Sequence, residues 1–190
     1  SAFLRHLVDR GLTGVRLIIS DACRGLMESA AEYLPEARWQ RCMVHFYRNV
    51  FSHVPTTKVR EVSHMLKAIH AQESRDAADR KARAIVDDLR AARMNAAADL
   101  VVRSVPETLT YYAFPDIHCQ KIRTNNPLER IMKEIRRRTR VVGAFPDGQS
   151  CLNLAAARLR YIAGTAWSAK CYMNMRPLYQ PQVVQTEAVA

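Results

Sequence analysis

Residues 15–21 have the sequence VRLIISD, and this stretch decides how the fold is built. A short run of mainly β-branched apolar side chains predicts a buried strand, Val15–Ser20, with the carboxylate of Asp21 at its C-terminal end. In open α/β sheets, ligands bind beyond that end of the strands, which makes Asp21 a candidate site residue. The structural alternative is that Asp21 caps the following helix.

The sequence around this strand predicts alternating helices and strands. Apolar residues at helical spacing indicate a helix over residues 2–9, closed by Gly11, and another over residues 23–34, closed by Pro35. Residues 37–42, ARWQRC, predict a second short strand. The order helix, strand, helix, strand favours a mixed α/β fold.

Helical periodicity dominates the rest of the chain. Residues 43–98 show no strand pattern, and we interpret them as a helical block of about three helices. Residues 104–119 contain Pro106 and Pro115 and predict an irregular connection. Three further elements are expected: a helix that starts at Pro127 with Asn126 as its cap, a turn over residues 145–148 and a last helix over residues 149–164. An all-helical insertion in an α/β fold explains this order.

Positive charge is concentrated in one part of the sequence. The formal net charge is +11, and residues 121–140 contain eight bases and two acids, which gives +6 (eight minus two) in twenty residues. Such a stripe is typical of a polyanion binder, and nucleic acid is favoured over membrane because no lipid-facing apolar side accompanies it. The alternative is a solvated face of a basic protein.

One acid, Glu129, stands near the start of this basic helix. It borders an apolar stripe that we expect to face the core, formed by Leu128, Ile131, Met132 and Ile135. Three bases lie on the same side of the helix as Glu129: Lys133, Arg136 and Arg140. A capping box with Asn126 and Pro127 is the structural alternative. Together, Asp21 and Glu129 offer the hard oxygen ligands that Mg²⁺ or Mn²⁺ needs for phosphoryl transfer.

Composition disfavours two other classes of protein. No run approaches the roughly 18 apolar residues of a membrane span, and no signal peptide opens the chain, so we expect a soluble, cytoplasmic protein. Five cysteines without a CxxC pair indicate reduced thiols rather than a disulfide framework. Because the chain begins with Ser1 inside an expected helix, we expect a fragment whose missing part lies upstream.

Three blocks of the sequence resemble, in order and spacing, bacterial insertion-sequence transposases of the Mutator-like DDE family. The blocks are RGLTGVRLIISDACRGLMESA, RWQRCMVHFYRNV and TNNPLERIMKEIRRRTRVVGAFPDGQS, and the resemblance runs from Phe3 to Trp167. It implies a partial ribonuclease H-like α/β fold with a large all-helical insertion. The implied domains are a first part of the catalytic core (1–42), the insertion (43–118), the rest of the core (119–178) and a flexible tail (179–190).

The resemblance also implies the site. Asp21 matches the second catalytic Asp and Glu129 the catalytic Glu, and both are expected to bind Mg²⁺ or Mn²⁺ in a two-metal site of the intact enzyme. The expected activity is cleavage of DNA at transposon ends and strand transfer, by a self-associating, nucleoid-associated enzyme. The DNA-binding residues are expected to be Arg123, Lys133, Arg136, Arg137, Arg138 and Arg140.

The sequence departs from the family pattern at one important point. The first catalytic Asp and the region that recognises transposon ends have no match here, and Asp9 is no substitute because it lies on the helix before the strand. Two alternatives to an active enzyme therefore stay open: a non-catalytic DNA-binding fragment, or a degenerate transposase remnant.

Cys42 and His45 match a C-x2-H signature of the family whose role is unsettled. The pair could bind Zn²⁺ together with His118 and Cys119, because four Cys and His ligands satisfy a structural zinc ion. The alternative, which we favour, is that these side chains are packed or hydrogen-bonded.

Overall fold

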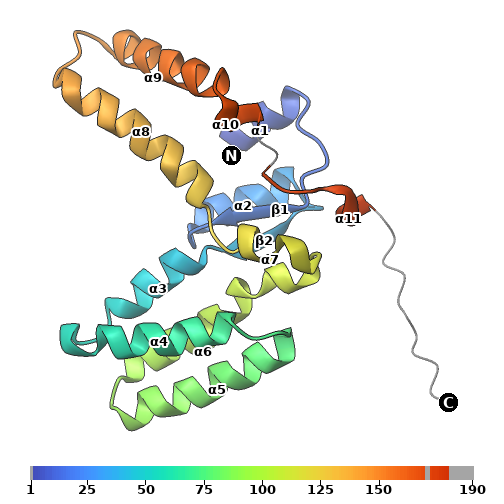
Figure 1. The fold of residues 1–190 in the computed structure, drawn as a ribbon, viewed down its shortest axis with the longest axis vertical. Helices are drawn as coiled ribbons and strands as arrows, with labels where there is room; N and C mark the ends of the chain where they lie inside the picture. Colours follow the sequence, from blue (N-terminus) through green and yellow to red (C-terminus); the bar gives the residue numbers. More distant parts are fainter. Residues whose placement is uncertain (1, 170–171, 180–190) are drawn as a thin grey trace. The chain divides into compact units, whose positions relative to one another are not determined.

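The computed structural model describes residues 2–169 and 172–179. The chain divides into two compact units, Ser1–Thr124 and Asn125–Ala190, and each is described by itself (Figure 1). All buried side chains among the described residues belong to the first unit, which therefore contains the hydrophobic core. The division between units falls inside the segment 119–178 that the sequence assigns to one domain.

A two-stranded parallel sheet organises the first unit. Strand β1 (Leu17–Ser20) pairs with β2 (Arg38–Arg41) in the register Leu17 with Arg38 and Ser20 with Arg41. Parallel strands need a crossover connection, and helix α2 (Arg24–Tyr33) supplies it. Helix α1 (Ala2–Asp9) packs against α2 and is followed by Gly11 at φ +93°. Both predicted strands and both predicted helices of this region are confirmed.

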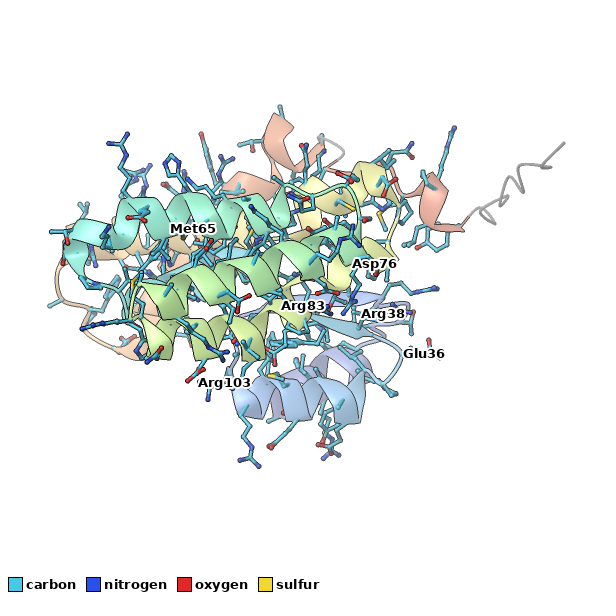
Figure 2. The ribbon with its side chains drawn as sticks, turned by 90° about the horizontal axis from the view of Figure 1, so that it is seen from below. Glu36, Arg38, Met65, Asp76, Arg83 and Arg103 are labelled. Atoms are coloured by element: carbon cyan, nitrogen blue, oxygen red, sulfur yellow. The ribbon has the colours of Figure 1, made fainter. Side chains whose placement is uncertain are left out.

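Four helices form a bundle that follows β2. They are α3 (Met43–Phe51), α4 (Val59–His70), α5 (Arg75–Ala91) and α6 (Asn95–Thr108), with a short 3₁₀ helix η1 (Thr56–Lys58) before α4. Apolar side chains at helical spacing, such as Phe46, Leu66, Ile85 and Val101, are buried between the helices. Figure 2 shows the charged side chains of Asp76 and Arg83 on α5. The predicted helical block is confirmed, but it contains four helices rather than about three.

The expected irregular connection over residues 104–119 is wrong. Helix α6 continues through Pro106 to Thr108, and a 3₁₀ helix η2 (Thr110–Ala113) and helix α7 (Asp116–Ile122) follow. Pro106 is exposed, so the backbone carbonyl that it leaves without an amide partner lies toward the outer side of the helix, where proline is best tolerated. The packing of the opposite side of α6 keeps the helix intact.

Polar side chains join the sheet to the end of α6. Gln40, fully buried on β2, donates to the carbonyl of Thr108 (2.6 Å) and accepts from the amide of Tyr111 (2.9 Å). Arg41 donates to Ser104 (2.8 Å) and pairs with Glu107 (2.9 Å). These contacts fix the end of β2 relative to the bundle.

A buried histidine connects three helices of the bundle. The ring nitrogens of His70 on α4 lie 2.9 Å from the hydroxyl of Tyr47 on α3 and 2.9 Å from the hydroxyl of Thr108 on α6. Burial lowers the pKa of His70 to about 4, so the ring is neutral near neutral pH.

The second unit is a helical hairpin with two short helices after it. Helix α8 (Asn126–Val142) ends at Gly143 (φ +80°) and packs against α9 (Gly148–Ala163), whose cap Asp147 accepts from the amide of Ser150. Helices α10 (Ala166–Ala169) and α11 (Arg176–Tyr179) follow. The predicted turn and last long helix are confirmed. The flexible tail predicted over 179–190 lies, after Tyr179, outside the described residues.

The apolar stripe of α8 differs from its prediction as a core face. No side chain of α8, all of which the structure describes, is buried, and Leu128 and Met132 are 58% and 40% exposed. Ile131 and Ile135 are only partly buried. A hairpin of two helices is too thin to enclose a core of its own, because each helix covers the other on one side only.

The fold is thus mixed α/β and mostly helical, with one small parallel sheet. No helix in the described part of the chain is long and apolar enough to cross a membrane.

Candidate active site

Asp21 lies where the sequence predicts it, directly after the last residue of β1. It is exposed, and it is not the cap of α2, because the helix begins at Arg24 and its cap residue is Cys23. Within the described part of the chain, the Asp21 carboxylate forms neither an ion pair nor a hydrogen bond. The helix-capping alternative for Asp21 is therefore wrong, and its carboxylate has no structural contact with the described residues.

The backbone beside Asp21 is held by several hydrogen bonds. The indole Nε1 of Trp39 donates to the Oγ of Ser20 (2.9 Å), and that Oγ donates to the carbonyl of Asp21 (2.7 Å). The carbonyl of Ser20 accepts from the amide of Cys42 (2.7 Å). The carbonyl end of β1 is therefore tied to β2 by both backbone and side chain.

Glu129 lies in the first turn of α8 and is partly buried. The helix begins one residue earlier than the sequence predicts: its cap is Asn125, so Pro127 is the second helical residue and Glu129 the fourth. The amide of Glu129 donates to the carbonyl of Asn125 (3.2 Å). A capping box between Asn126 and Glu129, which requires a spacing of three from the cap, is not formed. Asp21 belongs to the first unit and Glu129 to the second.

Five of the six bases of α8 divide into two groups. Arg137 donates two hydrogen bonds of 2.9 Å to Glu134, Arg138 lies 3.4 Å from the same carboxylate, and Arg158 of α9 lies 2.6 Å from it. The hydrogen bonds from Arg137, followed by the charges of Arg137 and Arg158, lower the pKa of Glu134 to about 2. Glu134 therefore stays ionised and fixes the two helices of the hairpin.

The other group is exposed along one side of α8. Lys133, Arg136 and Arg140 lie four, seven and eleven residues after Glu129, within about 60° of one another on the helix at 100° per residue. None of the three forms an ion pair in the part of the chain that the structure describes. These side chains can therefore contact phosphates without first breaking an internal pair.

Arg123 lies in the first unit and packs against it. Its guanidinium lies over the ring of Tyr111 at 4.4 Å, its Nε is buried without a hydrogen-bond partner, and its carbonyl accepts from the amide of Met43 (3.0 Å). A cation over an aromatic ring is a stabilising contact, so Arg123 has a packing role besides the DNA contact predicted for it.

The Cys and His candidates for zinc are mainly packed side chains. Cys42 is fully buried at the start of α3, and His118 and Cys119 are buried on α7. The Cys119 thiol donates to the carbonyl of Tyr111 (3.7 Å), and burial raises its pKa, which disfavours the thiolate that zinc requires. No cluster of three or more His, Cys, Asp or Glu side chains suited to a metal occurs among the described residues.

The sequence interpretation missed three contacts that shape this site. The pairing of Glu134 with Arg137 and Arg138 was readable from their spacing of three and four residues. The pairing with Arg158 was not readable, because that residue comes from the next helix. The hydrogen bonds of Ser20 to Trp39 and Asp21 were also missed, and the only sign of them in the sequence is that Ser20 is a polar residue at the end of an apolar run.

Comparison with known proteins identifies the class of protein to which this sheet, helical bundle and basic hairpin belong. A family model described as Transposase, Mutator family, matches residues 1–167, which is most of the chain. The chain belongs to the Mutator family of transposases.

Several curated relatives are described as transposases for insertion sequence elements. The transposase for insertion sequence element IS406 of Burkholderia multivorans is 37% identical over 176 residues, which cover 92% of this chain and 45% of the relative. The transposase for ISRM5 of Rhizobium meliloti is 36% identical, covering 93% and 44%. The transposase for IS1081 of Mycobacterium tuberculosis is 37% identical, covering 83% and 38%. The chain thus spans less than half the length of each of these relatives.

Proposed function

We propose that these 190 residues form part of the catalytic core of a DDE-type transposase with a ribonuclease H-like fold. The proposed activity is metal-dependent cleavage of DNA at transposon ends and transfer of the freed strand to target DNA. The observation that carries this proposal is the exposed Asp21 carboxylate, which closes a parallel strand, caps no helix and belongs to a chain of the Mutator family. Cytoplasmic, nucleoid-associated location and self-association of the intact enzyme are part of the same proposal.

The proposed metal ligands are Asp21 and Glu129. Their carboxylates have the oxygen chemistry that Mg²⁺ and Mn²⁺ prefer, and the exposed Asp21 needs to break no contact within its unit to bind an ion. A bound divalent ion would supply positive charge at the attacking and leaving oxygens of a phosphodiester displacement. The first Asp of the family triad has no counterpart in these 190 residues, so a complete site needs a third carboxylate from elsewhere.

DNA is the proposed partner of α8. Lys133, Arg136 and Arg140 would hold phosphates beside the metal ligands, because they are exposed and form one stripe with Glu129. Contacts of this kind position DNA without reading its sequence. Arg137 and Arg138 are weaker candidates, since both already pair with Glu134.

The test is Mn²⁺-dependent nicking of transposon-end DNA by the longest reading frame that contains these residues. Asp21→Asn and Glu129→Gln should each abolish nicking while DNA binding persists. Asp9→Asn is the matched control, because Asp9 is an exposed carboxylate whose partner is Arg5 on its own helix. Unchanged nicking by both site variants would contradict the proposal.

A non-catalytic DNA-binding fragment is the second candidate function. The exposed bases of α8 favour it, because phosphate contacts need no metal and no third carboxylate. For this function, the 190-residue chain alone should bind DNA with strong salt dependence but never nick it, and Asp21→Asn should leave its binding unchanged. Affinity that hardly changes with salt would contradict this function.

A further inference from the structure

Ser20 is held by hydrogen bonds of both its backbone and its side chain at the end of β1. Its carbonyl accepts from the amide of Cys42 (2.7 Å), its Oγ accepts from the indole of Trp39 (2.9 Å), and the same Oγ donates to the carbonyl of Asp21 (2.7 Å). The residue is 7% exposed, so water competes little for these bonds. One small side chain therefore links β2 to the backbone of the candidate metal ligand.

The chemistry of the groups fixes the direction of this chain of hydrogen bonds. An indole N–H can only donate, so the hydroxyl of Ser20 must act as the acceptor toward Trp39. A hydroxyl has a single proton, and this proton is then available for the carbonyl of Asp21. Two bonds in such a series polarise each other, which makes the pair stiffer than either bond alone.

The position of the chain of hydrogen bonds explains why it matters. The pairing of β1 with β2 ends at Ser20 opposite Arg41, and Asp21 follows it outside the ladder. Beyond the ladder, a loop backbone gains freedom unless a side chain holds it. Trp39 and Ser20 extend the rigidity of the sheet by one residue, to the residue whose carboxylate is exposed.

We propose that Ser20 and Trp39 are positioning residues that hold Asp21 in the geometry required for binding a divalent metal. This inference rests on the proposed function, in which Asp21 is a metal ligand. Neither side chain needs to touch the ion, because a ligand whose backbone is fixed loses less conformational freedom on binding. Removing the hydroxyl of Ser20 or the indole donor of Trp39 should therefore lower the affinity for the metal by more than a loss of protein stability alone would.

A matched serine separates this effect from general loss of stability. Ser29 on α2 is also 7% exposed, lies in the same unit, and donates its hydroxyl proton to the carbonyl of Gly25 at 2.8 Å. Ser29→Ala deletes the same group from an equally buried site, where the hydroxyl bonds to its own helix rather than to the backbone of Asp21. Because alanine favours a helix more than serine does, Ser29→Ala should change the melting temperature little, and the melting temperature of each variant is measured beside its Mn²⁺ affinity.

The experiment compares Ser20→Ala, Trp39→Phe, Ser20→Thr and Ser29→Ala in the longest reading frame containing the chain. Mn²⁺ affinity is measured directly by electron paramagnetic resonance, the half-saturating Mn²⁺ concentration from nicking, and stability by melting temperature. Ser20→Ala and Trp39→Phe should each weaken Mn²⁺ binding about tenfold, the lower end of the range for residues that support metal ligands. DNA affinity should change less than about twofold, since no DNA-binding candidate is altered.

Two further variants sharpen the result. Ser20→Thr keeps a hydroxyl on a β-branched residue suited to a strand, so it should restore Mn²⁺ affinity close to that of the parent. The double variant Ser20→Ala, Trp39→Phe should be no weaker than Ser20→Ala alone, because both changes interrupt one chain of hydrogen bonds.

The inference is overturned if Ser20→Ala changes Mn²⁺ affinity no more than Ser29→Ala does, while Asp21→Asn abolishes binding. That outcome leaves the proposed function intact. If Asp21→Asn itself leaves Mn²⁺ affinity and nicking unchanged, the proposed function fails and this inference fails with it.

Discussion

Arg158 and Glu134 form an ion pair that joins helix α9 to helix α8, with 2.6 Å between Nη2 and Oε1. Arg137 and Arg138 pair with the same carboxylate from α8 itself. One acid thus serves three guanidinium groups. This arrangement holds the hairpin together and also decides which bases of α8 are available to a ligand.

The first prediction concerns DNA binding by the exposed bases. The plot of log affinity against log salt has a negative slope. Replacing Lys133, Arg136 and Arg140 by Ala should make this slope shallower by about 2.7, because each phosphate that is no longer neutralised removes about 0.9 from its magnitude. Replacing Arg137 and Arg138 by Ala is the control and should change the slope by much less, because both pair with Glu134. Fluorescence anisotropy with one DNA duplex at several salt concentrations measures both slopes. Equal changes for the two sets would contradict this assignment.

The second prediction concerns Glu134→Gln. This variant should loosen the hairpin yet raise non-specific DNA affinity, because Arg137 and Arg138 lose their anionic partner. Hydrogen exchange of α8 and α9 should become faster, while anisotropy should report tighter binding. Glu28→Gln, which removes an exposed ion pair with Arg24, is the control and should change neither. Weaker DNA binding by Glu134→Gln would show that Arg137 and Arg138 do not gain access to phosphates.

Glu134 also predicts a pH dependence of the hairpin. Its pKa is about 2 in the fold against an ordinary value of 4.5, so the stabilisation is complete above pH 4.5 and is lost as the pH falls toward 2. Hydrogen exchange of α8 and α9 measured between pH 5 and pH 2.5, corrected for intrinsic rates, should reveal this loss. In Glu134→Gln the loss should be absent over the same range.

The fourth prediction concerns His70. Its pKa is lowered to about 4 in the fold from 6.5, so the unfolded chain takes up the proton first as the pH falls. Stability of the first unit should therefore be full above pH 6.5 and decline between pH 6.5 and 4, by a total on the order of 3 kcal/mol. Urea unfolding at pH 7 and pH 5 measures the decline.

The control for His70 lies on the same helix. His70→Gln should flatten the pH dependence between pH 7 and pH 5, whatever it does to absolute stability. His64→Gln changes an exposed histidine of α4 and should leave the dependence as it is. A decline that persists unchanged in His70→Gln would assign it to another group.

The fifth prediction concerns the ion pair between the sheet and α6. Glu107→Ala should destabilise the first unit by about 2 kcal/mol, because it leaves the Arg41 guanidinium, 9% exposed, without its anionic partner. The value lies below that of a fully buried pair because Glu107 is partly exposed. Glu61→Ala, which removes an exposed pair with Lys58, should cost less than about 0.5 kcal/mol. Similar losses in the two variants would contradict a special role for Arg41.

Local patterns in the sequence were sufficient to predict individual strands, helices and turns. The strand before Asp21 and the turn before α9 were both predicted, because a local pattern of apolar or turn-forming residues marks each of them. Pro106 was misread because the packing of α6 on β2 and α3 outweighs the local preference of proline. The start of α8 was misplaced by one residue, which rules out the capping box between Asn126 and Glu129.

The contacts that shape the candidate site were harder to predict because they join distant residues. Trp39 reaches Ser20 across nineteen positions, and Arg158 reaches Glu134 from another helix. Their partners become visible only once the strand register and the helical hairpin are formed. The candidate ligands Asp21 and Glu129, by contrast, were identified by their positions at the ends of elements and by family resemblance.

If Asp21 and Glu129 bind a common metal centre, as we propose, iron-mediated cleavage of the protein backbone should reveal both residues in one experiment. Fe²⁺ replacing Mg²⁺ in the longest reading frame, with ascorbate and peroxide, produces hydroxyl radicals that cut the chain close to the bound ion. We expect cuts near residue 21 and near residue 129, both suppressed by excess Mg²⁺ and both lost in Asp21→Asn. Cuts near only one of the two residues, or a pattern unchanged in Asp21→Asn, would contradict this proposal.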